Sequence, residues 1–163
     1  MSAVPPPPPP APAVLPVDYV EAARRHMTDA EFLRNGNRHA NAGQLYGFVA
    51  ECGLKALLIV CGVTPDANGE IPSRHRLRQH VPHLPVRIVA EGHLIPDGAR
   101  AGQYLTSLAH LGDFRAWSTD HRYWRDAAIP VHLLSTWKQA AEEILQALDQ
   151  AKLDQAQAAG VLT

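Results

Sequence analysis

Arginine, histidine and aromatic side chains gather in one stretch of the second half of the chain, residues 112–126 (GDFRAWSTDHRYWRD). Guanidinium groups stabilise negative charge, and an imidazole titrates near neutral pH. Aromatic rings beside arginines stack on nucleobases while the arginines hold phosphates. Such rings equally anchor a loop on the core, which is the commoner role of a tryptophan. The candidate RNA contacts in this stretch are Trp117, Arg122 and Tyr123.

A second cluster, residues 74–87 (RHRLRQHVPHLPVR), holds four arginines and three histidines and no acid. It is the most basic part of the chain. Its candidate RNA contacts are Arg74, Arg76 and Arg78. The spacing of its histidines matches no zinc site, and the chain has no glycine-rich phosphate loop, so we expect neither a metal nor a cofactor.

Composition limits the class of protein. The 163 residues suit one domain with a tail, and a net charge of −1 gives no overall basic field for nucleic acid. The two cysteines, Cys52 and Cys61, fall in one expected helix, too far apart to form a disulfide, so we expect a cytoplasmic protein. No uninterrupted apolar run reaches the ~18 residues of a membrane span, and the N-terminus lacks a secretion signal, so we expect no membrane contact.

The element that must position these clusters is an apolar stretch at residues 41–61. Its apolar side chains recur at three- and four-residue steps, which predicts a buried central helix. Gly47 and Gly53 each cost about 1 kcal/mol in a helix interior, so we expect another helix to pack too closely there for a side chain. Glu51 and Lys55 form an i,i+4 pair beside the core, where losing one partner strands the other.

Caps and turns place the neighbouring helix. Asp18 is a fair N-cap for a helix over residues 18–35, and Gly36 is its natural stop. Only a short turn separates this helix from the central one, which makes the two antiparallel neighbours. No stretch of the chain alternates between polar and apolar residues, so the predicted fold class is all-α.

The chain divides into a tail and one domain. Residues 1–16 hold eight of the fourteen prolines and predict a disordered leader, which either stays a tail or serves as a ligand for a groove on a partner. Shorter helices are expected at residues 86–91 and 99–111, and Pro130 opens a last one. The expected organisation is a leader (1–16), a helical domain (17–155) and a flexible C-terminal tail (156–163).

A family resemblance supports this organisation. Residues 42–57 read A-x-x-L-x-G-x-x-x-E-x-x-L-K-A-L, and His75 with Leu77 forms an H-x-L motif after them. With the two antiparallel helices, this pattern resembles the HEPN domain (higher eukaryotes and prokaryotes nucleotide-binding) over residues 19–148. The resemblance implies an up-down bundle of four to five helices that is commonly a homodimer.

The resemblance also implies a chemistry. Many HEPN proteins are metal-independent endoribonucleases, and many are toxins of toxin–antitoxin or defence systems. Their motif is an arginine, four to six residues, then a histidine. Arg115 and His121 have this spacing, although Ala116 stands where active members usually carry a polar residue. Arg115 would stabilise charge on the phosphate and His121 would take the 2′-hydroxyl proton, with residues of two subunits meeting at one site.

Two function hypotheses therefore stay open. The first is a metal-independent endoribonuclease or RNA-binding toxin with its site at Arg115 and His121. In the structural alternative, Arg115 pairs with Asp113 or Asp120 and His121 is a surface residue. The second hypothesis is a non-catalytic helical module that binds a partner protein or a nucleotide through residues 74–87. An antitoxin would be the partner under the first hypothesis.

Overall fold

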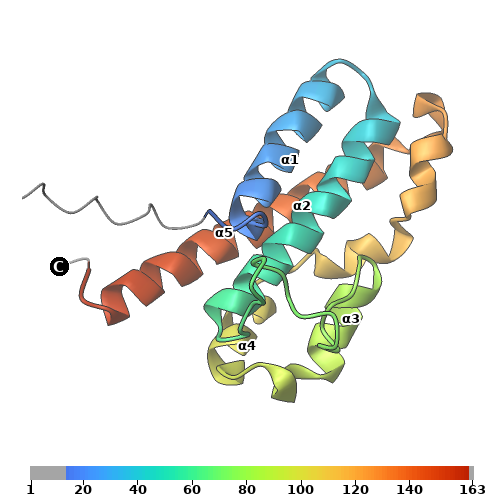
Figure 1. Cartoon of the computed structure of the whole chain (residues 1–163). Coiled ribbons are helices and arrows are strands. Elements are labelled where there is room, and N and C mark those ends of the chain that lie inside the picture. The colour runs from blue at the N-terminus through green and yellow to red at the C-terminus, as the bar shows by residue number, and fades with distance from the viewer. Residues whose placement is uncertain (1–13, 162–163) are drawn as a thin grey trace, which may run out of the picture.

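The fold is helical throughout the part of the chain that the structure describes. The computed structural model describes residues 14–161, and no strand occurs among them (Figure 1). The predicted all-α class is confirmed. Residues 1–13 of the expected leader lie outside the described residues, and residues 14–16 are exposed and carry no helix.

Two antiparallel helices, α1 (Tyr19–Asn35) and α2 (His39–Val60), form the first half of the fold (Figure 1). Asp18 caps α1 as expected, because its carboxylate accepts hydrogen bonds from two backbone N–H groups at 2.8 and 2.9 Å. Gly36 ends α1, but with an ordinary φ of −84°. The turn instead places Asn37 in the left-handed region, with φ of 57°, which asparagine tolerates better than most residues.

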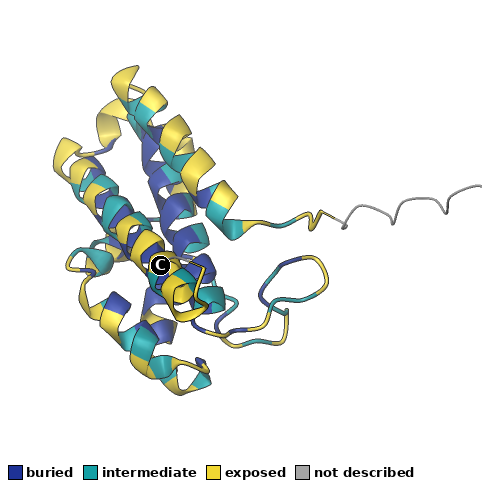
Figure 2. Cartoon of the chain, turned by 90° about the vertical axis from the view of Figure 1, so that its left-hand side faces the viewer, coloured by how far each residue is buried: buried dark blue, intermediate teal, exposed yellow. Residues whose placement is uncertain are grey.

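The helix α2 is the buried centre of the fold, between α1 and α5 (Val131–Ala158) (Figure 2). Leu54 and Leu57 are almost completely buried, as the sequence predicts for this helix. Among the described helices, only α2 is long enough and apolar enough on average to cross a membrane. Polar residues interrupt its apolar sequence. In this structure 67% of its most apolar 18-residue window is buried inside the fold.

Close packing explains the glycines of α2. A Cβ on Gly53 would lie 2.5 Å from Cγ2 of Ile144, so α5 is the closely packed helix predicted there. At Gly47 the neighbour is different: a Cβ would lie 2.0 Å from the indole ring of Trp117, which comes from an irregular segment. The glycine therefore makes room for a tryptophan side chain rather than for a helix.

Short elements connect α2 to α5. They are α3 (His83–Ala90), η1 (Gly92–Leu94), α4 (Gly98–Thr106), η2 (Leu111–Ala116), η3 (Thr119–Tyr123) and η4 (Asp126–Ala128). The helix expected at 86–91 begins earlier, because Pro85 lies in the first turn of α3, where its missing N–H costs no hydrogen bond. The helix expected at 99–111 ends at Thr106, and 3₁₀ turns replace the rest.

The last helix, α5, begins where Pro130 predicts and buries one face against the core. Trp137, Ile144 and Leu148 are fully buried, and Pro130 precedes the first helical residue. The helix continues to Ala158, three residues into the segment expected to be a flexible tail. Residues 162–163 lie outside the described part of the chain.

Candidate functional site

The candidate site lies on residues 111–128, a run of 3₁₀ turns that covers the N-terminal half of α2. Three hydrogen bonds hold it there. Gln44 donates to the carbonyl of Ser118 at 2.6 Å. The Trp117 indole donates to the carbonyl of Gly43 at 2.8 Å, and the backbone N–H of Ala40 donates to the Asp126 carboxylate at 2.8 Å. Long-range contacts with α2, rather than local helical propensity, therefore fix the conformation of this segment.

The imidazole of His121 is buried, with 6% of the residue exposed. Its ring stacks on Trp137 at a centroid distance of 5.3 Å and meets Trp124 edge-on at 4.4 Å. Within residues 14–161 its Nδ1 atom has no hydrogen-bond partner. Burial lowers the pKa of His121, and the charge of Asp120 opposes that shift. The imidazole is therefore neutral at neutral pH, as a proton acceptor must be, but two indole rings pack against it, so it is not the surface residue of the structural alternative.

Arg115 lies on η2 and is exposed. It forms no ion pair with Asp113, Asp120 or any other acid in the described part of the chain, so the expected structural pairing is absent from residues 14–161. The two motif residues thus differ in environment: the guanidinium is open to solvent and the imidazole of His121 is covered. The structure places them on consecutive 3₁₀ turns without giving both access to the same surface.

Trp117 is a core residue rather than an exposed ring. It is 2% exposed, its indole fills the space beside Gly47, and it meets Phe48 edge-on at 6.0 Å. Trp117 therefore anchors the loop on the core, the commoner of the two roles considered for it. Its ring is not available to stack on a base in this conformation.

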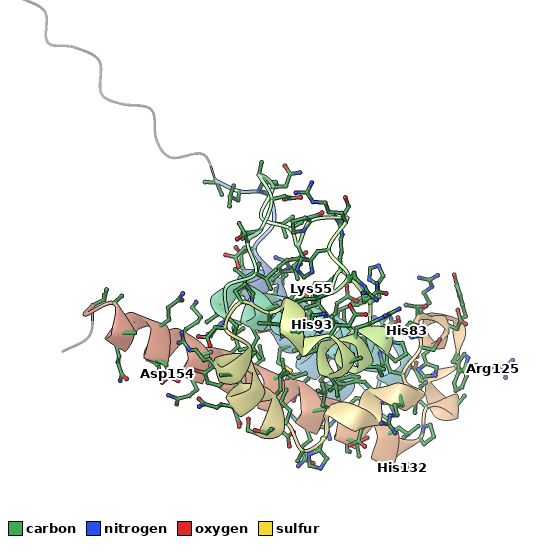
Figure 3. All side chains as sticks on the ribbon, turned by 90° about the horizontal axis from the view of Figure 1, so that it is seen from below. Lys55, His83, His93, Arg125, His132 and Asp154 are labelled. Carbon is green, nitrogen blue, oxygen red and sulfur yellow. The ribbon has the colours of Figure 1, made fainter. Side chains whose placement is uncertain are left out.

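The exposed residues of the segment form what we call the 122–125 ridge. The guanidinium of Arg122 lies 4.7 Å from the ring centre of Tyr123, which is 74% exposed. Trp124 is 48% exposed, and Arg125 projects from the edge of the molecule (Figure 3). Of the predicted contacts, Arg122 and Tyr123 therefore lie on the surface. Trp124 also belongs to the ridge but was not among the predicted contacts. Its position between Tyr123 and Arg125, in a run of arginines and aromatic residues, is the sequence pattern that could have indicated it.

The basic segment 74–87 carries less free charge than its sequence suggests. Arg76 and Arg87 both pair with the buried carboxylate of Glu91, at 2.8 and 2.6 Å. Arg78 pairs with Glu70 at 2.6 Å. Acids from outside the segment thus offset most of its arginines. Arg74 is exposed and has no ion-pair partner among the residues that the structure covers.

A polar cluster built on the nearly buried Glu51 fastens the same segment to α2. Oε1 of Glu51 lies 2.7 Å from Nζ of Lys55 and 2.9 Å from Nδ1 of His80, and its Oε2 accepts from the backbone of Val81 at 3.3 Å. The Glu51 and Lys55 side chains are 13% and 7% exposed, so the pair lies beside the core as predicted. The contact with His80 was not predictable, because nothing local joins residues 29 apart.

Neither a metal centre nor a known relative identifies the site. No group of three histidine, cysteine or acidic side chains in residues 14–161 is placed to hold a metal ion. Cys52 and Cys61 are free, and burial raises the pKa of Cys52 to about 11, so this thiol stays protonated at neutral pH. Comparison with protein-family models, curated proteins and solved structures found no match for this chain.

Proposed function

We propose that this protein is a HEPN-like helical domain that binds single-stranded RNA through the 122–125 ridge. The observation that carries the proposal is the exposed Tyr123 ring with the Arg122 guanidinium 4.7 Å away, next to the half-exposed Trp124. Rings of this kind stack on unpaired bases, and the adjacent arginines neutralise phosphates. The paired arginines of residues 74–87 make that segment the weaker RNA surface.

The HEPN-like assignment is part of the proposal and rests on α1 and α2. Their antiparallel packing and the buried Glu51–Lys55 pair agree with the motif at residues 42–57. The homodimer that the resemblance implies, and a role as a toxin countered by an antitoxin, remain predictions. A test of the oligomeric state by sedimentation would address the first of these.

Metal-independent RNA cleavage is the second candidate function, and one observation favours it. His121 keeps Nδ1 unpartnered in residues 14–161, and its lowered pKa leaves the imidazole neutral and able to accept a proton. For cleavage, Trp124 must move away from the imidazole, and Arg115 of this or a second copy must reach the same phosphate. Binding needs neither change, so we place binding first.

A titration of a fluorescent single-stranded RNA, followed by anisotropy, tests the binding proposal. Tyr123→Ala should raise Kd about 5-fold or more, because one stacking contact is worth roughly 1–3 kcal/mol. Arg122→Gln should lower the slope of log Kd against log salt by about 0.7, one phosphate contact. The matched control is Phe32→Ala, which removes an equally exposed ring from α1. Equal affinities for wild type, Tyr123→Ala and Phe32→Ala would refute the ridge as the RNA site.

Incubation of the protein with RNA in EDTA tests cleavage. An active enzyme should leave 2′,3′-cyclic phosphate ends and spare DNA, because the internal 2′-hydroxyl is the nucleophile. His121→Ala and Arg115→Ala should each lose about 10²-fold or more in rate. Since His121 is buried, circular dichroism must show that its variant is folded. Intact RNA after incubation with a protein that binds it would leave binding as the whole function.

A further inference from the structure

A pocket of about 340 Å³ opens between α3 and η2, away from the 122–125 ridge. Its volume is at the lower end of the range of small ligand pockets and suits one or two large side chains. The walls are mostly apolar, and each wall comes from a different element. The lining residues used below are Pro85, Val86 and Val89 from α3, and Leu111, Phe114 and Arg115 from η2.

The α3 wall continues onto the surface. Val86 is 56% exposed and Val89 is 79% exposed, whereas Leu84 and Ile88 on the other face are buried. This eight-residue helix is apolar on both faces, but the core covers only one of them. The second apolar face is left exposed to solvent. Exposed valines that border an apolar pocket form a continuous surface of the kind that protein partners cover.

The pocket has one charged lining residue, Arg115. Its guanidinium has no ion-pair partner in residues 14–161, in contrast to Arg87 on α3, which pairs with Glu91. An apolar cavity with one unpaired cation complements an apolar group that has a carboxylate next to it. A nucleobase fits this lining poorly, because the polar edges of the base would find a single hydrogen-bonding side chain there.

We propose that the α3–η2 pocket binds a short amphipathic segment of a partner protein. The segment inserts a large aliphatic or aromatic side chain between Val86, Val89 and Phe114 and places an acidic side chain on Arg115. The unpaired charge of Arg115 favours an acidic side chain on the segment. The exposed Val86 and Val89 favour an apolar face next to it. The proposal does not depend on RNA binding, because the ridge and the pocket share no residue.

Synthetic peptides of about a dozen residues test the proposal on the full chain. One peptide carries leucines at i, i+3 and i+4 with flanking glutamates, a second replaces the glutamates by lysines, and a third replaces the leucines by serines. Fluorescence anisotropy should show binding of the acidic apolar peptide only. Equal binding of the lysine peptide, or of the serine peptide, would overturn the proposed chemistry.

A charge exchange and a valine substitution locate the binding. Arg115→Glu should weaken the acidic peptide at least about tenfold and strengthen the lysine peptide, because the rim charge is reversed. Val89→Asp should abolish binding of the acidic peptide while the fold survives, since Val89 is exposed. The matched controls, Arg125→Glu and Val131→Asp, change an arginine and a 65% exposed valine outside the pocket and should leave affinity unchanged. If Arg125→Glu weakens peptide binding as much as Arg115→Glu does, or Val131→Asp as much as Val89→Asp, then the peptide does not bind in the α3–η2 pocket.

Two further measurements test whether a second copy of the chain or RNA occupies the pocket instead. The first is sedimentation of the protein without peptide. If the chain alone is a dimer that Val89→Asp dissociates, then a second copy occupies the pocket and the proposal fails. If Val89→Asp instead lowers RNA affinity as much as Tyr123→Ala does, then RNA occupies the pocket and the proposal also fails. A monomer or dimer unchanged by Val89→Asp, with peptide binding lost, supports the proposal.

Discussion

The three long helices and the connecting segment between them are stabilised in different ways. The helices α1, α2 and α5 are 17, 22 and 28 residues long and bury alanines, leucines and glycines against one another. Between α2 and α5 no helix exceeds nine residues. There, ion pairs to Glu70 and Glu91, the contact of His80 with Glu51 and hydrogen bonds from α2 hold the chain. All candidate site residues lie in this second region, which has more local freedom to open.

The largest difference should appear when the same charge is introduced into the two regions. Leu57→Asp places an unpaired carboxylate in the centre of α2, where 2% of the leucine is exposed, and should unfold the domain. Val89→Asp on α3 places it on the surface and should leave the melting temperature within a few degrees of wild type. Circular dichroism melts of both variants measure this contrast. A cooperative melt of Leu57→Asp near the wild-type temperature would contradict the central position of α2.

Removal of one charge should distinguish a buried pair from an exposed one. Glu51→Gln leaves the Lys55 ammonium, 7% exposed, without its anion and should cost about 3 kcal/mol in the free energy of unfolding. Glu21→Gln breaks an exposed i,i+4 pair with Arg25 on α1 and should cost less than about 0.5 kcal/mol. Urea titrations give both numbers. Equal costs would mean that the Glu51 cluster does not stabilise the connecting region.

Gly47→Ala tests the contact that joins the two regions. The new methyl group overlaps the Trp117 ring, so the ring must move, and we expect a loss of about 2 kcal/mol after the gain in helix propensity. Gly102→Ala, on α4, meets no atom within 4 Å and should stabilise the protein by up to about 1 kcal/mol. Tryptophan fluorescence and urea titration report both effects. A Gly47→Ala protein as stable as Gly102→Ala would place the Trp117 ring elsewhere.

The smallest expected effect is on pH dependence. Burial lowers the pKa of His121 in the folded state, so the unfolded chain binds the proton more readily below its ordinary value of 6.5. The free energy of unfolding should therefore fall as the pH drops below about 6.5, and His121→Phe should reduce that slope. The pKa of His26 is also lowered, by burial and by the charge of Arg25, so His26→Phe should reduce the slope too, and the double variant should have the flattest profile. Identical slopes in all four proteins would contradict burial of these rings.

The sequence predicted the long helices well, and the reason is physical. A period of 3.6 residues over 17 or more positions leaves one consistent inner face, so α1 and α2 lie within a few residues of their expected bounds and α5 begins directly after Pro130, as expected. Single positions do not all follow this pattern: Phe32, an aromatic residue near the end of α1, is 77% exposed.

The site was predictable in residue type but not in geometry. Residues 111–128 have no period that assigns faces, so nothing in the sequence separates the buried Trp117 and His121 from the exposed Arg122 and Tyr123. Contacts with α2 determine which of these side chains are buried. The carbonyl of Gly43, 74 residues before Trp117, accepts the hydrogen bond of its indole, and Gly47 leaves the space that the indole fills. Contacts of that range cannot be read from local spacing.

The hydrogen bond from Ala40 to Asp126 has a consequence for the time course of synthesis. Arg38, at the N-terminus of α2, supplies no side-chain cap of its own, and the acceptor comes from 86 residues downstream. At 5–20 residues per second a ribosome needs about 4–17 s to make that length of chain. During this interval the nascent α2 has neither its cap nor its cover, and its apolar surface is open to chaperones or to neighbouring chains. The face of α2 that α5 covers stays open for longer, until residues 131–158 have also left the ribosome.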